Sequence, residues 1–80
     1  MNWHERIEVK HDVLGGKPVV TGTRIAVAFV VELLAQGWSV EDLLEQYPAL
    51  TKDDVQACLQ YASELLKSEQ VHSLPASRRA

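Results

Sequence analysis

The sequence predicts a mainly α, three-helix domain preceded by a short two-stranded N-terminal β ribbon. Apolar residues recur at helical spacing in three segments, residues 26–36, 40–47 and 52–67. Two of these segments begin with a capping pattern, while residues 6–21 contain two short extended segments joined by a turn, the first of which alternates between apolar and charged side chains. We therefore expect one domain over residues 1–67 and a flexible C-terminal tail over residues 68–80.

The ribbon comes first along the chain. Ile7 and Val9 alternate with charged residues, and Val19 and Val20 lie beyond a glycine pair that favours a turn. Two isolated strands are marginally stable in water. We therefore expect the ribbon to pair with that of a second copy and to bury some of these four side chains in a shared sheet.

The first helix is expected over residues 26–36, with Thr23 as its N-terminal cap and Gly37 just past its end. Its apolar residues lie nearly all round the helix: Val27, Phe29, Val30, Val31, Leu33 and Leu34. A helix that is apolar on every side is normally buried, so this one is expected to be central.

The next two helices begin with the same N-terminal capping pattern. Ser39 is followed three residues later by Asp42, and Thr51 is followed in the same way by Asp54. Each pair matches a capping box, in which two side chains satisfy free amides of the first turn. The third helix then carries one apolar stripe: Val55, Cys58, Leu59, Ala62, Leu65 and Leu66.

The composition of the chain argues against several classes of protein function. The chain has 80 residues, a formal charge of −3 and a single cysteine, Cys58, so no disulfide can form within it and no zinc-ligand spacing is present. The three histidines, His4, His11 and His72, have no spacing that suggests a metal or acid–base site. We expect a cytoplasmic protein that is not an enzyme, has no catalytic residues, and needs neither a cofactor nor a metal; no segment is apolar enough to enter a membrane.

The stretch GGKPVVTGTR at residues 15–24 has the glycines and the lysine of a phosphate-binding loop. The glycine that such a loop requires ahead of its lysine is replaced by His11, and the magnesium-binding Ser or Thr after the lysine is replaced by Pro18. We therefore interpret the glycines as turn residues, with Gly22 permitting a second reversal of the chain.

Three stretches together resemble a known family: GGKPVVTGTRI, LLAQGWSVEDLLEQYP and LTKDDVQACLQYA. Their order and spacing resemble the small bacterial and archaeal family catalogued as domain of unknown function 433, from about Ile7 to Leu66. The motif positions, to which we assign structural roles, are Gly16, Lys17, Pro18, Gly22, Thr23, Arg24 and Pro48. The resemblance implies a homeodomain-like fold. It also implies a VapB-type antitoxin that is encoded beside a PIN-like ribonuclease toxin.

The helix pair over residues 40–67 has the proportions of a helix-turn-helix, but its charge does not suit DNA. Residues 38–67 contain six carboxylates and two lysines, a net charge of −4, and Asp53 and Asp54 lie in the turn that would face the bases. If DNA is bound, a likelier surface is formed by the basic residues of the ribbon: Arg6, Lys10, Lys17 and Arg24. Arg24 has an alternative structural interpretation, as a partner of Glu32 or Asp12.

The tail ends in Arg78 and Arg79. A PIN-like nuclease gathers acidic residues around a divalent metal ion, so these arginines are our candidate toxin-binding residues. We expect a dimeric antitoxin that neutralises a PIN-like nuclease, with DNA-binding autoregulation as a further activity. The alternative is a free-standing helix-turn-helix regulator without a toxin partner.

Overall fold

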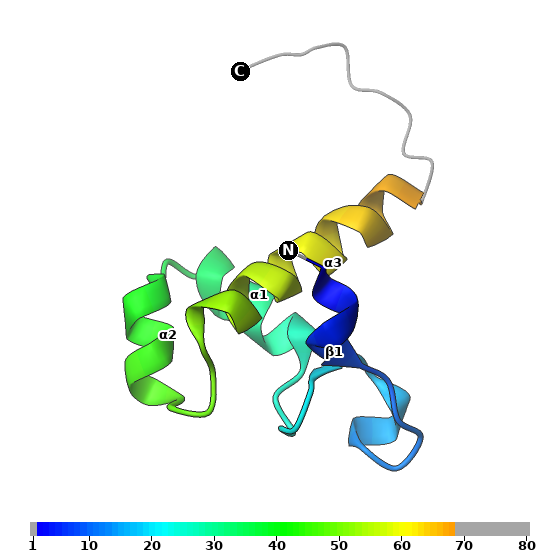
Figure 1. Cartoon of the computed structure of the whole chain (residues 1–80). Coiled ribbons are helices and arrows are strands. Elements are labelled where there is room, and N and C mark those ends of the chain that lie inside the picture. The colour runs from blue at the N-terminus through cyan, green and yellow to red at the C-terminus, as the bar shows by residue number, and fades with distance from the viewer. Residues whose placement is uncertain (1, 69–80) are drawn as a thin grey trace, which may run out of the picture.

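The computed structural model describes residues 2–68, and within them three helices follow a small antiparallel sheet (Figure 1). The elements in chain order are η1 (Trp3–Glu5), β1 (Ile7–Glu8), η2 (Leu14–Gly16), β2 (Val19–Val20), α1 (Val27–Ala35), α2 (Val40–Gln46) and α3 (Lys52–Ser68). The predicted fold class, mainly α with a two-stranded ribbon ahead of three helices, is confirmed.

The ribbon is supported by the chain's own helices. β1 and β2 pair antiparallel, with Ile7 opposite Val20 and Glu8 opposite Val19. Ile7, Val19 and Val20 are all buried, whereas Val9 lies beyond β1 and is 59% exposed. The expectation of an unsupported ribbon is therefore wrong, because its apolar side chains already lie in the domain core.

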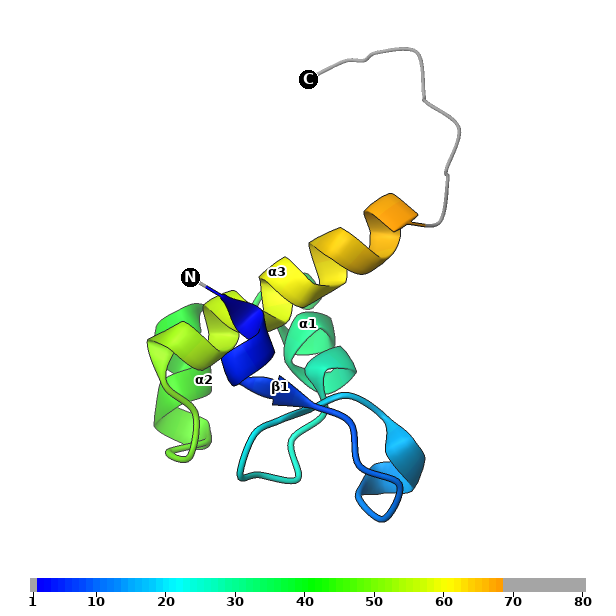
Figure 2. The same ribbon diagram turned by 45° about the vertical axis from the view of Figure 1, so that its right-hand side comes forward.

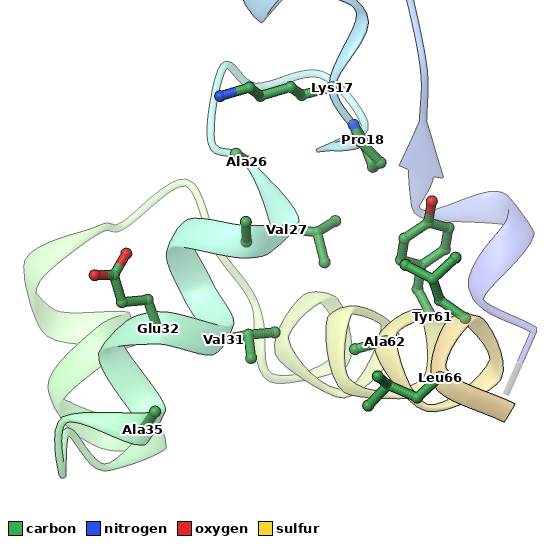
Figure 3. A pocket seen from close by; sticks show the side chains of 12 residues that line it. Lys17, Pro18, Ala26, Val27, Val31, Glu32, Ala35, Tyr61, Ala62 and Leu66 are labelled. Carbon is green, nitrogen blue, oxygen red and sulfur yellow. The ribbon is translucent and has the colours of Figure 1, made fainter. Parts of the chain in front are cut away.

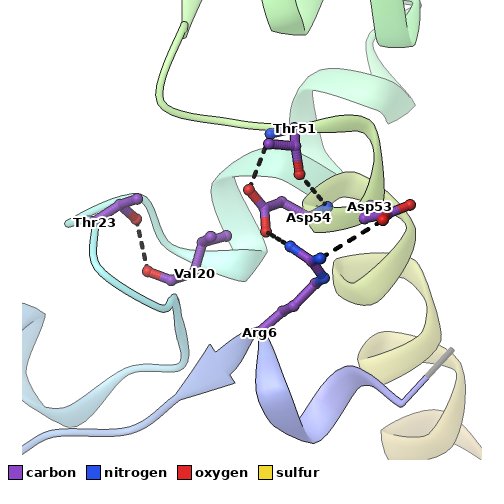
Figure 4. A network of polar contacts seen from close by, with 6 residues as sticks. All are labelled: Arg6, Val20, Thr23, Thr51, Asp53 and Asp54. Carbon is purple, nitrogen blue, oxygen red and sulfur yellow. Dashed lines mark hydrogen bonds and ion pairs between the residues drawn. The ribbon is translucent and has the colours of Figure 1, made fainter.

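The connection from β2 to α1 also differs from the prediction. Thr23 does not cap α1, whose N-cap is Ala26 with no side-chain hydrogen bond. The Thr23 hydroxyl instead donates to the Val20 carbonyl at 2.8 Å (Figure 4). The same hydroxyl accepts from the Ile25 amide at 2.9 Å. Gly22 has φ +80°, a left-handed conformation that favours glycine, so Gly22 and Thr23 together close a tight turn before the helix.

The core lies where the three helices meet the ribbon. Leu43 of α2 and Val55 and Cys58 of α3 are fully buried there beside Val30 of α1. Trp3 and Trp38 are partly buried against the edges of this cluster. Full burial of such an aliphatic side chain contributes about 1.5–3 kcal/mol, so a core this small leaves little reserve.

Both α1 and α3 leave apolar side chains exposed within residues 2–68. The C-terminal half of α3 projects past the other helices (Figures 1 and 2), and there Leu65 is 50% and Leu66 59% exposed. α1 is covered on one side only, and Ala28 and Ala35 on its other side are exposed. The apolar circumference of α1 predicted a helix buried on all sides, and the structure corrects this.

A buried carboxylate joins the two ends of the domain (Figure 4). Asp54 accepts from the Thr51 amide at 2.9 Å, and its own amide donates to the Thr51 hydroxyl at 3.1 Å, which confirms the predicted capping box. Its second oxygen accepts from the guanidinium of Arg6 at 3.1 Å, while Asp53 lies 3.6 Å from the same group. The Asp54 side chain is 10% exposed and that of Asp53 is 62% exposed, so the two neighbours have unequal effects on stability.

Asp54→Ala should destabilise the domain by about 2 kcal/mol, because it removes a helix cap and leaves Arg6 without its partly buried partner. Asp53→Ala is the matched control and should cost less than about 0.5 kcal/mol, because exposed ion pairs contribute little. Urea denaturation followed by circular dichroism measures both values. Equal losses for the two variants would contradict the importance of Asp54.

Candidate functional site

A shallow hollow with two carboxylates lies where α1 turns into α2. It has a volume of about 280 Å³ and is lined by Gln36, Gly37, Trp38, Asp42, Glu45 and Gln46. One indole ring, two carboxylates and two amides therefore meet at one place on the surface.

The end of α1 fixes the position of Trp38. Gly37 adopts φ +102° directly after the helix. The Trp38 amide donates to the Leu33 carbonyl at 3.1 Å, and the Gly37 amide donates to that of Leu34 at 3.0 Å. These two bonds form a Schellman motif, which places the indole against the core edge beside Tyr47, with ring centroids 6.4 Å apart.

The start of α2 fixes Asp42. The Asp42 amide donates to the Ser39 hydroxyl at 3.0 Å, and the Asp42 carboxylate accepts from the Ser39 amide at 2.9 Å, so the predicted capping box is confirmed. The hydrogen bonds from the Ser39 backbone and side chain hold the pKa of Asp42 below its usual value. Asp42 therefore stays ionised at neutral pH, and Glu45 stands one helical turn away on the same face.

This arrangement suits a positively charged side chain. A guanidinium or ammonium group can lie over an indole face while it pairs with carboxylates, and Gln36 and Gln46 offer further hydrogen-bonding atoms. Neither Asp42 nor Glu45 forms an ion pair within residues 2–68. The hollow can therefore bind a basic side chain that comes from a partner.

A second, apolar groove lies between α1 and the C-terminal half of α3 (Figure 3). Its volume is about 560 Å³. It is lined by Lys17, Pro18, Ala26, Val27, Ala28, Val31, Glu32, Ala35, Tyr61, Ala62, Leu65 and Leu66. Only Lys17 and Glu32 are charged, so the groove lacks the converging polar groups of a small-molecule site.

The four basic residues predicted to bind DNA have different surroundings in the structure. The guanidinium of Arg6 is bound to Asp54 and Asp53, and the ammonium of Lys10 lies 3.8 Å from a Glu8 carboxylate oxygen. Lys17 and Arg24 are exposed, and neither forms an ion pair with another residue of the range 2–68. Glu32 and Asp12, the alternative structural partners of Arg24, therefore do not hold it.

The remaining motif residues shape turns. Gly16, with φ +85°, closes η2, and the Pro18 carbonyl accepts from the Val27 amide at 3.0 Å and so fixes the start of α1. Pro48 follows the C-cap of α2, where a residue without an amide hydrogen ends the helix. The candidate toxin-binding residues, Arg78 and Arg79, lie outside the described residues.

A family described as "Protein of unknown function (DUF433)" matches residues 7–62, most of the chain. The chain belongs to the DUF433 family. A crystal structure of another DUF433 member, from Anabaena variabilis ATCC 29413, has a TM-score of 0.73 and 32% sequence identity. The similarity covers 79% of this chain and 62% of that one, so the family resemblance extends to the fold.

A curated relative is considerably longer. The uncharacterized protein y4eO of Sinorhizobium fredii (strain NBRC 101917 / NGR234) is 45% identical over 51 residues, which is 64% of this chain and 23% of that protein. The present chain thus spans about a quarter of this curated relative and less than two thirds of the crystallised protein.

The sequence did not reveal the hollow, although it indicated Gly37 at the end of the first helix and the Ser39–Asp42 capping box, which position Trp38 and Asp42. The link between the helices is so short that the end of α1 and the first turns of α2 share one surface. Within residues 2–68 no group of three or more metal-ligating side chains occurs, and no helix is long and apolar enough to span a membrane.

Cys58 lies in the core, and burial, together with the charge of Asp54, raises the pKa of its thiol to about 12. Because the thiolate is the reactive form, folded protein at pH 8 should react with a disulfide reagent at least about 100-fold more slowly than urea-unfolded protein. Absorbance of the released thiol measures both rates. Equal rates would contradict this burial.

Proposed function

We propose that this chain is an antitoxin, a cytoplasmic protein that binds and neutralises a PIN-like ribonuclease encoded beside it. The observation that carries the proposal is the acidic hollow formed by Trp38, Asp42 and Glu45 between α1 and α2. The hollow offers a partner an aromatic face and two carboxylates that no basic residue of the described range neutralises.

Electrostatic complementarity connects this surface to a nuclease. A ribonuclease has to bind a polyanionic backbone, and it does so through lysine and arginine side chains. An inhibitor with ordered carboxylates at its surface is attracted to those side chains and can occupy the place of the RNA phosphates. Glu41, which is also exposed on α2, adds to the same negative face.

The acidic helix pair argues against the alternative, a free-standing helix-turn-helix regulator. The first turn of α3 would have to approach the bases, yet it presents Asp53 to solvent and holds Arg6 in an ion pair. Autoregulatory DNA binding remains part of the proposal only through other basic residues of the N-terminal region: Lys10, Lys17 and Arg24.

Glu45→Lys tests the hollow directly. Glu45 is exposed and is not an α2 capping residue, so the variant should fold normally and should weaken inhibition of the ribonuclease about tenfold by repelling its basic surface. The measurement is cleavage of a fluorescent RNA by the neighbouring nuclease at increasing antitoxin concentration.

Glu5→Lys is the matched control, since it makes the same charge change at an exposed position in η1, remote in sequence from the hollow. It should inhibit like the parent. If Glu45→Lys inhibits as well as Glu5→Lys, the hollow is not the contact surface. If even the parent fails to bind the nuclease, the antitoxin proposal itself is rejected.

The tail arginines are proposed to contribute to inhibition of the nuclease separately from the hollow. Deletion of residues 69–80 removes Arg78 and Arg79 but keeps every buried residue of the core, so the melting temperature should change by less than about 2 °C. Inhibition of the nuclease should weaken, because the charge-assisted contacts to its acidic metal pocket are lost. An equally inhibitory truncated chain would place all of the contact on the helical body.

A further inference from the structure

The apolar groove is an unusual feature in a domain with so small a core. Leu65 and Leu66 are half-exposed along one wall, and the opposite wall is the uncovered side of α1 (Figure 3). Clustered apolar surface of this kind marks a protein contact, whereas single exposed leucines do not. Something has to cover this groove.

The shape of the groove indicates what covers it. Its α3 wall carries the half-exposed Leu65 and Leu66 beside Tyr61 and Ala62. Its α1 wall exposes two alanines, Ala28 and Ala35, beside Val27 and Val31. One surface therefore presents both exposed leucines and exposed alanines. A patch that binds a copy of itself needs such complementary parts on the same surface.

The two charged side chains of the groove, Lys17 and Glu32, suit a twofold-symmetric contact between two copies. Lys17 lies where α1 begins, beside Pro18, whereas Glu32 lies in the second half of α1 (Figure 3). A twofold axis through the middle of the groove reverses its direction and brings the Lys17 end of one copy to the Glu32 end of the other. Both copies then gain a pair of opposite charges at the rim of an apolar contact.

We infer that the groove between α1 and α3 is a homodimer interface, in which Leu65 and Leu66 of each copy pack against the alanines on α1 of the other copy. The contact covers apolar side chains on both walls that are exposed within residues 2–68, Leu65 and Leu66 on α3 and Ala28 and Ala35 on α1. It also moves the expected dimer contact away from the ribbon, whose apolar side chains are already buried. The groove and the acidic hollow share no lining residue, but they are neighbours, because Gln36 of the hollow donates a hydrogen bond to Glu32 of the groove at 3.5 Å. Leu66→Asp, on α3, therefore tests dimerisation without changing a residue that lines the hollow.

Sedimentation equilibrium of the full chain without nuclease provides the test. The parent should be a dimer at high-micromolar concentration. Leu66→Asp should raise the dimer dissociation constant at least about 100-fold, because two buried leucines are lost in each dimer. Leu59→Asp is the matched control: Leu59 is 40% exposed on the same helix but does not line the groove, so this variant should dimerise like the parent.

Charge reversal tests the orientation. Lys17→Glu and Glu32→Lys should each weaken the dimer about tenfold, because each change places like charges together twice in a dimer. The double variant should return to within about threefold of the parent, because opposite charges meet again. Circular dichroism confirms that each variant is folded.

A monomeric parent chain would overturn the inference, as would a Leu66→Asp dimer of parental affinity. A double charge variant that stays as weak as the single variants would also overturn it. If the parent is a monomer and the nuclease alone protects the groove from hydrogen exchange, the occupant is the nuclease and not a second copy.

Discussion

The structure depends on one carboxylate, that of Asp54. With one oxygen it completes the capping box of α3, and with the other it binds the only cation that reaches it from the N-terminal ribbon among residues 2–68, Arg6. Because this group is almost fully buried, both oxygens need partners inside the protein. The ribbon, the third helix and the core around Cys58 are therefore held in one arrangement, which explains how an 80-residue chain keeps two very short strands in place.

The charged groups at the start of α3 and those at the start of α2 have different roles. At the start of α3, acidic and basic groups neutralise each other and serve the fold. At the start of α2, the carboxylate of Asp42 serves a cap, while Glu41 and Glu45 face solvent without a basic partner in the described part of the chain. Negative charge is therefore available to a partner beside Trp38, while the first turn of α3 presents Asp53 to solvent and holds Arg6 in an ion pair. The proposed preference for a protein partner over a nucleic acid follows from these two features.

Local patterns in the sequence predicted the elements well, because local chemistry determines them. The Ser39 and Thr51 caps, the left-handed Gly37 and the helix periodicity each depend on residues within one or two turns. Long-range partners could not be predicted in this way. Arg6 appeared to be a free cation because its carboxylate partner lies 48 residues away. Thr23 appeared to be a helix cap because the sequence does not reveal that its hydroxyl closes the preceding turn. The groove was missed because periodicity shows which residues are apolar, but not which of them the fold leaves uncovered.

The separation between Arg6 and Asp54 has a consequence for the order of folding. Contacts between residues far apart in the sequence form late, since closing the long intervening loop costs entropy before the contact stabilises anything. During synthesis the ribbon leaves the ribosome before the helices, yet the carboxylate that anchors it belongs to the last of them. Ile7 and Val20 therefore lack the cover of α3 until that helix has emerged, and the ribbon becomes fully native only after segments that are synthesised later.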